Sequence, residues 1–136
     1  MHKKLNSILL VDDDEATNFL HKIVLEEANI AEKIIIALNG EEALKIIREN
    51  AQNNIPQPDM IFLDINMPKM NGWEFVEEYQ KIETTKNIKL LIIMLTVSLN
   101  PDDRKKANNL HSINGFLNKP LTIDVLEEIM EDYFKA

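Results

Sequence analysis

Short apolar runs alternate with helical patterns along the chain, and this alternation restricts the possible folds more than any other feature. Five runs that suit buried strands cover residues 7–11, 33–37, 60–63, 90–95 and 115–118. A helical pattern follows each run, and in four of the five its apolar residues recur at three- and four-residue spacing. Strands separated by helices predict βαβ units, and therefore a doubly wound α/β fold whose parallel sheet has helices on both faces.

Polar residues mark the expected starts of the helices. Asp14, Asn39 and Thr122 each precede a helical pattern and suit the capping position. Asn100 is followed by proline and two acids, an order that suits the positive end of a helix. The apolar residues of the first helical pattern are Ala16, Phe19, Leu20, Ile23, Val24 and Ala28.

Length, charge and cysteine content narrow the class of protein. The 136 residues suit a single domain, 1–136, with a core of about 6–134. The net charge of −8 argues against binding to nucleic acid or to an anionic membrane surface. Cysteine is absent, and the apolar run at 8–11 is too short for a signal peptide or a membrane span. We therefore expect a cytoplasmic protein.

Glycine and histidine exclude other kinds of site. None of the three glycines belongs to a Gly-rich phosphate loop, so nucleotide binding of the Walker or dinucleotide type is not expected. The three histidines, His2, His21 and His111, lack the spacing of metal ligands. We expect all three at the surface.

Carboxylates follow the expected strands at their carboxyl ends, where parallel α/β sheets bind ligands. Clustered carboxylates repel one another unless a cation lies between them, and a hard divalent cation suits such oxygens. The polar residues at these strand ends are Asp12, Asp13, Asp14, Asp64, Asn66, Thr96, Ser98, Asn118 and Lys119. Several carboxylates, a hydroxyl and one amine match the needs of phosphoryl transfer to a carboxylate.

Each of these residues also has a simpler interpretation when taken alone. An aspartate after a strand is usually a helix cap or a turn residue, and Asp14 fits that role because it directly precedes a helix. Thr96 alone is typical of a strand end, and Lys119 alone is typical of a solvated surface. The functional interpretation depends on their joint occurrence on successive βα units.

Three segments carry a resemblance to a known family: ILLVDDD at 8–14, DMIFLDINMPKMNG at 59–72 and GFLNKPL at 115–121. Together they resemble the receiver domain of two-component response regulators, the CheY-like family, and the resemblance covers nearly the whole chain. It implies five parallel strands in the order 2-1-3-4-5, and a signalling role rather than turnover of a substrate.

The resemblance also implies residue roles. Asp64 would accept a phosphoryl group from a phosphohistidine, with Mg²⁺ as the cofactor. Asp13 would bind Mg²⁺ directly, Asp12 mainly through a water molecule, and Asn66 through its backbone carbonyl. The remaining implied roles are Lys119 as a phosphoryl contact, Thr96 and Phe116 as the switch pair, and a Lys119–Pro120 peptide bond that is often cis.

The implied partners are a sensor histidine kinase or a histidine phosphotransfer protein, and a downstream protein. The downstream contact would involve the fourth helix, fifth strand and fifth helix, including Phe116 and part of 101–109. No DNA-binding output domain is expected, because the last helical pattern reaches the end of the chain. Two residues depart from the family pattern: Val97, where a smaller residue is usual, and Phe116, which lacks the hydroxyl of tyrosine. We expect Val97 to crowd the phosphoryl group, and so to slow both phosphorylation by small donors and hydrolysis.

Three alternatives stay open. The chain could be a phosphorelay intermediate that passes the phosphoryl group onward. It could be a haloacid-dehalogenase-like phosphatase, which would depend chiefly on Asp12, although Thr17 lies one residue beyond the position that this class prefers. It could also be an unphosphorylated adaptor, against which the complete set of site residues argues.

Overall fold

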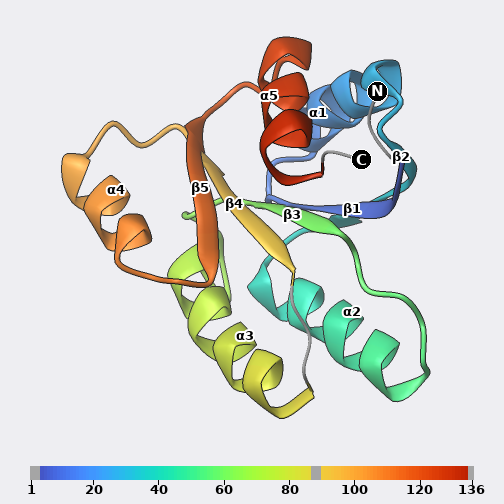
Figure 1. Ribbon diagram of the computed structural model, residues 1–136. Helices are drawn as coiled ribbons and strands as arrows, with labels where there is room; N and C mark the ends of the chain where they lie inside the picture. Colours follow the sequence, from blue (N-terminus) through green and yellow to red (C-terminus); the bar gives the residue numbers. More distant parts are fainter. Residues whose placement is uncertain (1–3, 87–89, 135–136) are drawn as a thin grey trace.

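Five parallel strands form one sheet in the order β2-β1-β3-β4-β5, as expected (Figure 1). The structure, a computed structural model, describes residues 4–86 and 90–134. Its strands are β1 (Leu5–Val11), β2 (Ala31–Ala37), β3 (Met60–Leu63), β4 (Leu91–Thr96) and β5 (Ile113–Asn118). Its helices are α1 (Glu15–Ala28), α2 (Gly40–Gln52), α3 (Gly72–Lys86), α4 (Pro101–Asn108) and α5 (Ile123–Tyr133).

Three strands, the central β1 and the edge strands β2 and β5, begin two residues earlier than their apolar runs predict. β2 starts at Ala31, which pairs with Leu5 of β1, and β5 starts at Ile113, which pairs with Ile92. Edge strands are partly exposed, so polar residues interrupt their apolar pattern while the backbone pairing continues. The prediction for β3, a fully buried central strand, was confirmed at both ends.

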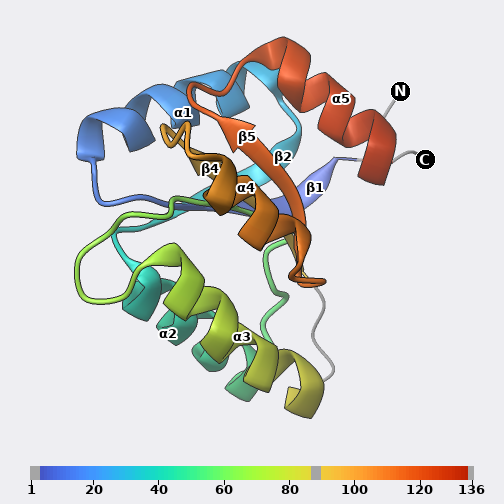
Figure 2. The ribbon, with the colours of Figure 1, turned by 90° about the vertical axis from the view of Figure 1, so that its left-hand side faces the viewer.

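Two layers of helices cover the sheet. Figures 1 and 2 show α1 and α5 on one face, and α2 and α3 on the other. α4 lies next to β5 and approaches α3, where the Lys106 ammonium is 4.7 Å from the centre of the Trp73 ring. Because side chains alternate along each strand, Leu9 and Leu63 face the α2–α3 layer whereas Leu10 and Phe62 face the α1–α5 layer. The apolar core therefore has two parts, one on each face.

The predicted helix caps were confirmed. The side chains of Asp14, Asn39, Asn100 and Thr122 each accept a hydrogen bond from a backbone N–H in the first turn of the following helix. α3 has a reciprocal cap that the sequence reading did not identify: Asn71 accepts from the Glu74 N–H, and Glu74 accepts from the Asn71 N–H. These caps fix the helix starts at the edge of the sheet where β1, β3, β4 and β5 end.

The predicted apolar stripe of α1 faces the core only in part, since Val24 and Ala28 pack against it. Phe19 is 64% exposed and Leu20 is 60% exposed, whereas the buried residues of this helix are Asn18, His21 and Leu25. The three buried residues are spaced i, i+3 and i+7, so they share one side of the helix. The helix itself was predicted, but its inner side carries two polar groups.

Within the part of the chain that the structure describes, no helix has both the length and the apolar character needed to cross a bilayer.

Candidate functional site

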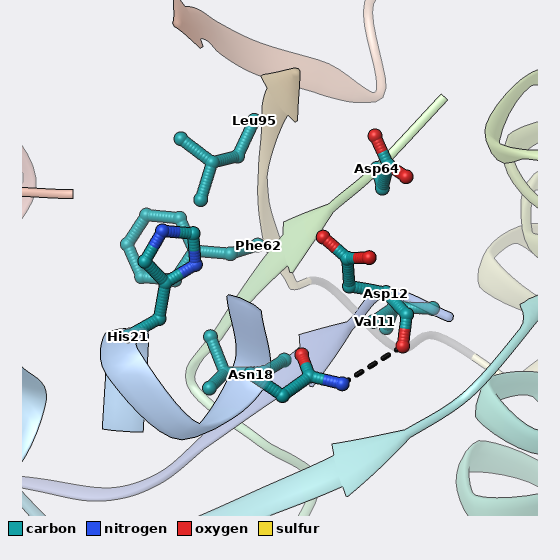
Figure 3. Close-up of a pocket in the computed structure, with 8 residues that line it drawn as sticks. Val11, Asp12, Asn18, His21, Phe62, Asp64 and Leu95 are labelled. Atoms are coloured by element: carbon teal, nitrogen blue, oxygen red, sulfur yellow. Dashed lines mark hydrogen bonds between the residues drawn. The ribbon is translucent and has the colours of Figure 1, made fainter. Parts of the chain in front are cut away.

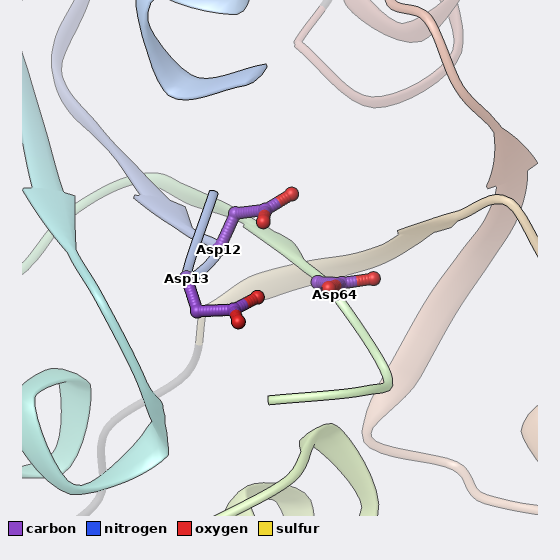
Figure 4. Close-up of side chains that lie close together, drawn as sticks. All are labelled: Asp12, Asp13 and Asp64. Atoms are coloured by element: carbon purple, nitrogen blue, oxygen red, sulfur yellow. The ribbon is translucent and has the colours of Figure 1, made fainter. Parts of the chain in front are cut away.

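Three aspartates converge at the carboxyl end of the sheet, as the sequence predicts (Figure 4). Asp12 and Asp13 follow β1, and Asp64 follows the neighbouring strand β3. One carboxylate oxygen from each of the three lies within 4.8 Å of the others. Asp12 and Asp64 are buried, whereas Asp13 is exposed. A cluster of this kind can bind a divalent cation through several oxygens while leaving one side open to solvent.

Lys119 joins the cluster from β5, at the far edge of the sheet. Its ammonium donates to the Asp12 carboxylate at 2.5 Å and lies 3.5 Å from the Asp64 carboxylate. The Lys119 N–H also donates to the Thr96 carbonyl, which places the lysine beside the end of β4. The Lys119–Pro120 peptide bond is cis, in agreement with the resemblance. The structure thus brings one amine against two of the three acids.

Burial raises the pKa of Asp64 to about 6, and the nearby charge of Asp12 adds to this effect. The ammonium of Lys119 opposes the shift without cancelling it. Desolvation lowers the pKa of Lys119, but its contacts with Asp12 and Asp64 outweigh desolvation, and the net shift is upward. Asp64 is therefore a carboxylate whose negative charge is only partly balanced by the protein, as expected of a group that also meets a cation.

The backbone after Asp64 is held by a close approach at Gly72. The Gly72 N–H donates to the Ile65 carbonyl at 2.8 Å, which closes the loop between β3 and α3. A Cβ at Gly72 would lie 2.5 Å from the Asp64 carbonyl oxygen. Only glycine fits this contact without movement of the backbone that carries Asp64.

The other predicted site residues lie around the same end of the sheet. Thr96 is fully buried at the end of β4, and its hydroxyl accepts from the Ser98 N–H. Asn66 is exposed in the loop after Asp64. Val97 is 70% exposed. Phe116 is partly buried in β5, with the Arg104 guanidinium of α4 4.8 Å from the centre of its ring.

The expectation of three surface histidines was wrong for His21. This side chain is 3% exposed, and its Nε2 accepts a hydrogen bond from the Leu121 N–H at 3.3 Å. Its partner lies 100 positions away, so no local pattern could identify the contact. His111 is exposed, as expected, and His2 lies outside the described residues. Asn18 was also missed: its amide donates to the Asp12 carbonyl at 2.8 Å.

Comparison with known proteins identifies the family. A model of the response regulator receiver domain matches residues 8–131. The chain belongs to this family. It is 32% identical to the response regulator Rcp1 of Synechocystis sp. over 125 residues, which cover 91% of this chain and 83% of Rcp1.

Solved structures agree with this assignment. A two-component response regulator from Cytophaga hutchinsonii is 30% identical, with a TM-score of 0.87, and the alignment covers 96% of this chain and 97% of that one. The phosphorylated cyanobacterial phytochrome response regulator RcpA is 28% identical, with a TM-score of 0.72 and coverage of 97% and 91%. The receiver is therefore CheY-like in both sequence and fold.

Receiver domains also occur in the same chain as histidine kinases. Residues covering 94% of this receiver match 15% of a Helicobacter pylori protein named sensor histidine kinase CheAY, with 27% identity. Membership of the family makes the receiver a signalling protein of two-component systems rather than an enzyme, so the phosphatase alternative is set aside. Its three clustered aspartates form the acidic pocket typical of the receiver Mg²⁺ site.

Proposed function

We propose that this receiver is a single-domain response regulator, residues 1–136 with a core of about 6–134, that accepts a phosphoryl group on Asp64. The donor is a phosphohistidine on a sensor histidine kinase or a histidine phosphotransfer protein. The observation that carries the proposal is the position of Asp64: it is 7% exposed, clusters with two other acids and lies 3.5 Å from the Lys119 ammonium. We propose that it acts in the cytoplasm, and its net charge of −8 argues against contacts with nucleic acid or an anionic membrane.

The residues present fit Mg²⁺. Asp12, Asp13 and Asp64 supply carboxylate oxygens, the ligands that Mg²⁺ prefers, and the backbone carbonyl of Asn66 is the fourth proposed ligand. When bound, Mg²⁺ would supply positive charge that neutralises the acids and the phosphoryl oxygens. The raised pKa of Asp64 supports this assignment, because it marks a buried charge that lacks full compensation within the protein.

The chemistry of the transfer needs little from the protein beyond position and charge. A carboxylate oxygen of Asp64 attacks phosphorus, the new P–O bond forms, and the P–N bond of the phosphohistidine breaks. The histidine leaves as an imidazole and takes up a proton. Lys119 holds a phosphoryl oxygen through its ammonium, and Thr96 offers its hydroxyl to another oxygen.

Phosphorylation of Asp64 would act on Thr96 and Phe116 as a switch. The modification adds charge and acceptor oxygens beside the Thr96 hydroxyl, which accepts a local hydrogen bond from the Ser98 N–H. Movement of Thr96 would open space for Phe116, whose ring packs partly in the core and under Arg104. Phosphorylation would shift the population of receiver molecules toward the conformation in which Thr96 and Phe116 have moved. The downstream protein would then recognise the face formed by α4, β5 and α5 in this conformation.

Val97 is proposed to affect the lifetime of the phosphoryl group. Its branched side chain stands 70% exposed next to Thr96, at the mouth of the site. We expect it to hinder the approach of both small donors and water. Val97→Ala should shorten the lifetime of the acyl phosphate several-fold, as measured by intact mass during decay; equal lifetimes would remove this role.

The proposal is tested by incubating the purified protein with purified candidate histidine kinases, ATP and Mg²⁺, and recording the intact mass. A single phosphoryl adduct on the wild type, missing in Asp64→Asn and in the presence of a chelator, is the expected result. Asp13→Asn serves as a matched variant, because it removes one proposed ligand and leaves the acceptor in place. An adduct that persists in Asp64→Asn would contradict the assignment.

A further inference from the structure

The ends of β1 and β5 carry the closest charged pair of the site, yet the sheet does not join these two strands. β3 and β4 lie between them in the strand order. Lys119 nevertheless contacts Asp12 at 2.5 Å, across the top of the two intervening strands. Contacts made above the sheet can therefore add to the strand pairing in fixing these two strand ends relative to each other.

Helix α1 makes such contacts with both ends. On one side, the Asn18 amide donates to the Asp12 carbonyl at 2.8 Å (Figure 3). On the other side, His21 Nε2 accepts from the N–H of Leu121, two residues after Lys119. Both side chains are buried and lie one helical turn apart. One rigid helix thus holds the backbone of an acid and the backbone next to the amine.

Asn18 and His21 are polar residues at buried positions where an apolar side chain would be usual. The Asn18 Oδ1 atom is buried and finds no hydrogen-bond partner among the described residues. Asn18 lines a small pocket of about 10 Å³ that His21, Asp12 and Asp64 also line. A buried polar atom without a partner destabilises a fold, so an apolar side chain would suit a purely structural position better. The contact of Asn18 with Asp12 offers a different reason for its presence.

We propose that Asn18 and His21 are positioning residues for the receiver site: Asn18 sets the place of Asp12, and His21 sets the place of the turn that carries Lys119. The proposal rests on the phosphoryl-acceptor function given above. His21 acts as a hydrogen-bond acceptor at Nε2, which requires a neutral ring with its proton on Nδ1. Burial, followed by the charge of Lys119, lowers the pKa of His21, while Asp12 opposes the shift, so the neutral form dominates at pH 7.

A pair of substitutions separates the acceptor role of His21 from its bulk. His21→Gln places an oxygen near the position of Nε2, whereas His21→Leu fills the space without an acceptor. We expect His21→Leu to slow phosphorylation by acetyl phosphate about tenfold, and His21→Gln to stay within about twofold of the wild type. His111→Gln, at an exposed histidine, is the matched control. Equal rates for the Leu and Gln variants of His21 would overturn its positioning role.

Asn18 is tested with the metal alone. Residues that orient a metal ligand typically contribute 10–100-fold to metal affinity. We therefore expect Asn18→Leu to weaken Mg²⁺ binding about tenfold by calorimetry, while His21→Leu changes it less than threefold. Circular dichroism and thermal unfolding check that each variant is folded. Unchanged Mg²⁺ affinity in a folded Asn18→Leu variant would overturn the role of Asn18.

The wild type provides a test that needs no variant and no phosphorylation. The ¹⁵N chemical shifts of the His21 ring, recorded without acetyl phosphate, should show an unprotonated Nε2 and a protonated Nδ1. A proton on Nε2 would contradict the proposal even if every variant failed to fold. If the wild type accepts no phosphoryl group, the proposed function is wrong. The ring shifts of His21 and the Mg²⁺ affinity of Asn18→Leu would still test the two positioning roles.

Discussion

Helix α1 is built differently from the two helices on the opposite face of the sheet. Between the sheet and helices α2 and α3 the interior is almost wholly apolar, and its buried helix residues are Ala43, Leu44, Ile47, Phe75, Val76 and Tyr79. The buried hydroxyl of Tyr79 accepts from the Leu90 N–H. Helix α1, on the opposite face, buries Asn18 and His21 and a single large apolar residue, Leu25.

The difference indicates that α1 and the α2–α3 layer contribute differently to the protein. The α2–α3 face buries large apolar side chains, which is the main source of folding free energy. α1 gives up part of that stabilisation and instead holds polar contacts with the strand ends that carry Asp12 and Lys119. Substitutions of apolar residues in the α2–α3 layer should therefore act on stability, whereas substitutions of Asn18 and His21 in α1 should act on the site.

The largest effect on stability is expected from Phe75→Ala on the α2–α3 face. Phe75 is fully buried and stacks on Tyr79 with ring centres 6.1 Å apart. Its loss should lower the free energy of unfolding by about 3–5 kcal/mol in denaturant titrations. Phe75→Leu, the milder control, should lose less. In both variants the Mg²⁺ affinity of the folded protein should be unchanged. A tenfold weaker affinity would show that the α2–α3 layer also acts on the site.

Gly72→Ala probes the point where the apolar face meets the site. The added Cβ would lie 2.5 Å from the Asp64 carbonyl oxygen, so the backbone must move. We expect a loss of about 1–3 kcal/mol in stability together with weaker Mg²⁺ binding. Gly115→Ala is the matched control, because its Cβ would lie 3.5 Å from Ile93, an ordinary contact. Similar losses in both variants would show that the strain is not specific to the site.

The acidic site should also respond to pH. Since Asp64 titrates at about 6 in the folded protein, protons compete with Mg²⁺ below this value, and affinity should fall up to tenfold per pH unit there. In metal-free protein the folded state holds this proton more tightly than the unfolded chain, whose ordinary value is 3.8. The contribution of Asp64 to stability is therefore lost as the pH rises from about 4 to 6. A Mg²⁺ affinity that stays flat between pH 5 and 7 would contradict the raised pKa.

The smallest effect is expected from Phe19→Ala on the outer side of α1. Phe19 is largely exposed, so its removal should change the free energy of unfolding by less than about 0.5 kcal/mol. Leu25→Ala, on the inner side of the same helix, should cost about 2–5 kcal/mol and serves as the positive control. A loss above 2 kcal/mol for Phe19→Ala would show that the outer side of α1 is packed after all.

The acidic cluster was predictable because each of its members is marked locally. Asp12 and Asp64 come directly after apolar runs, and the parallel arrangement brings such strand ends to one edge of the sheet. β3 and four helix caps were likewise predicted from short stretches of sequence. The motif at 59–72 also pointed to Gly72, whose close approach to Asp64 is visible only in the structure.

The inner side of α1 was not predictable in the same way. Two of its three buried residues are polar, and two large apolar residues, Phe19 and Leu20, are exposed, which departs from the usual rule for a helix on a sheet. His21 depends on a backbone N–H at Leu121, and Asn18 on the Asp12 carbonyl, and only the folded chain brings these groups together. Residues that position a site are therefore harder to identify from one sequence than the residues that form the site.

The most direct test of the central assignment is to locate the phosphoryl group. The protein would be phosphorylated in the presence of Mg²⁺, the acyl phosphate reduced with borohydride to homoserine, and the modified peptide sequenced by mass spectrometry. The account predicts homoserine at position 64 alone, and none when Mg²⁺ is removed. Homoserine at position 12 or 13, or labelling of position 64 that does not need a divalent cation, would contradict it.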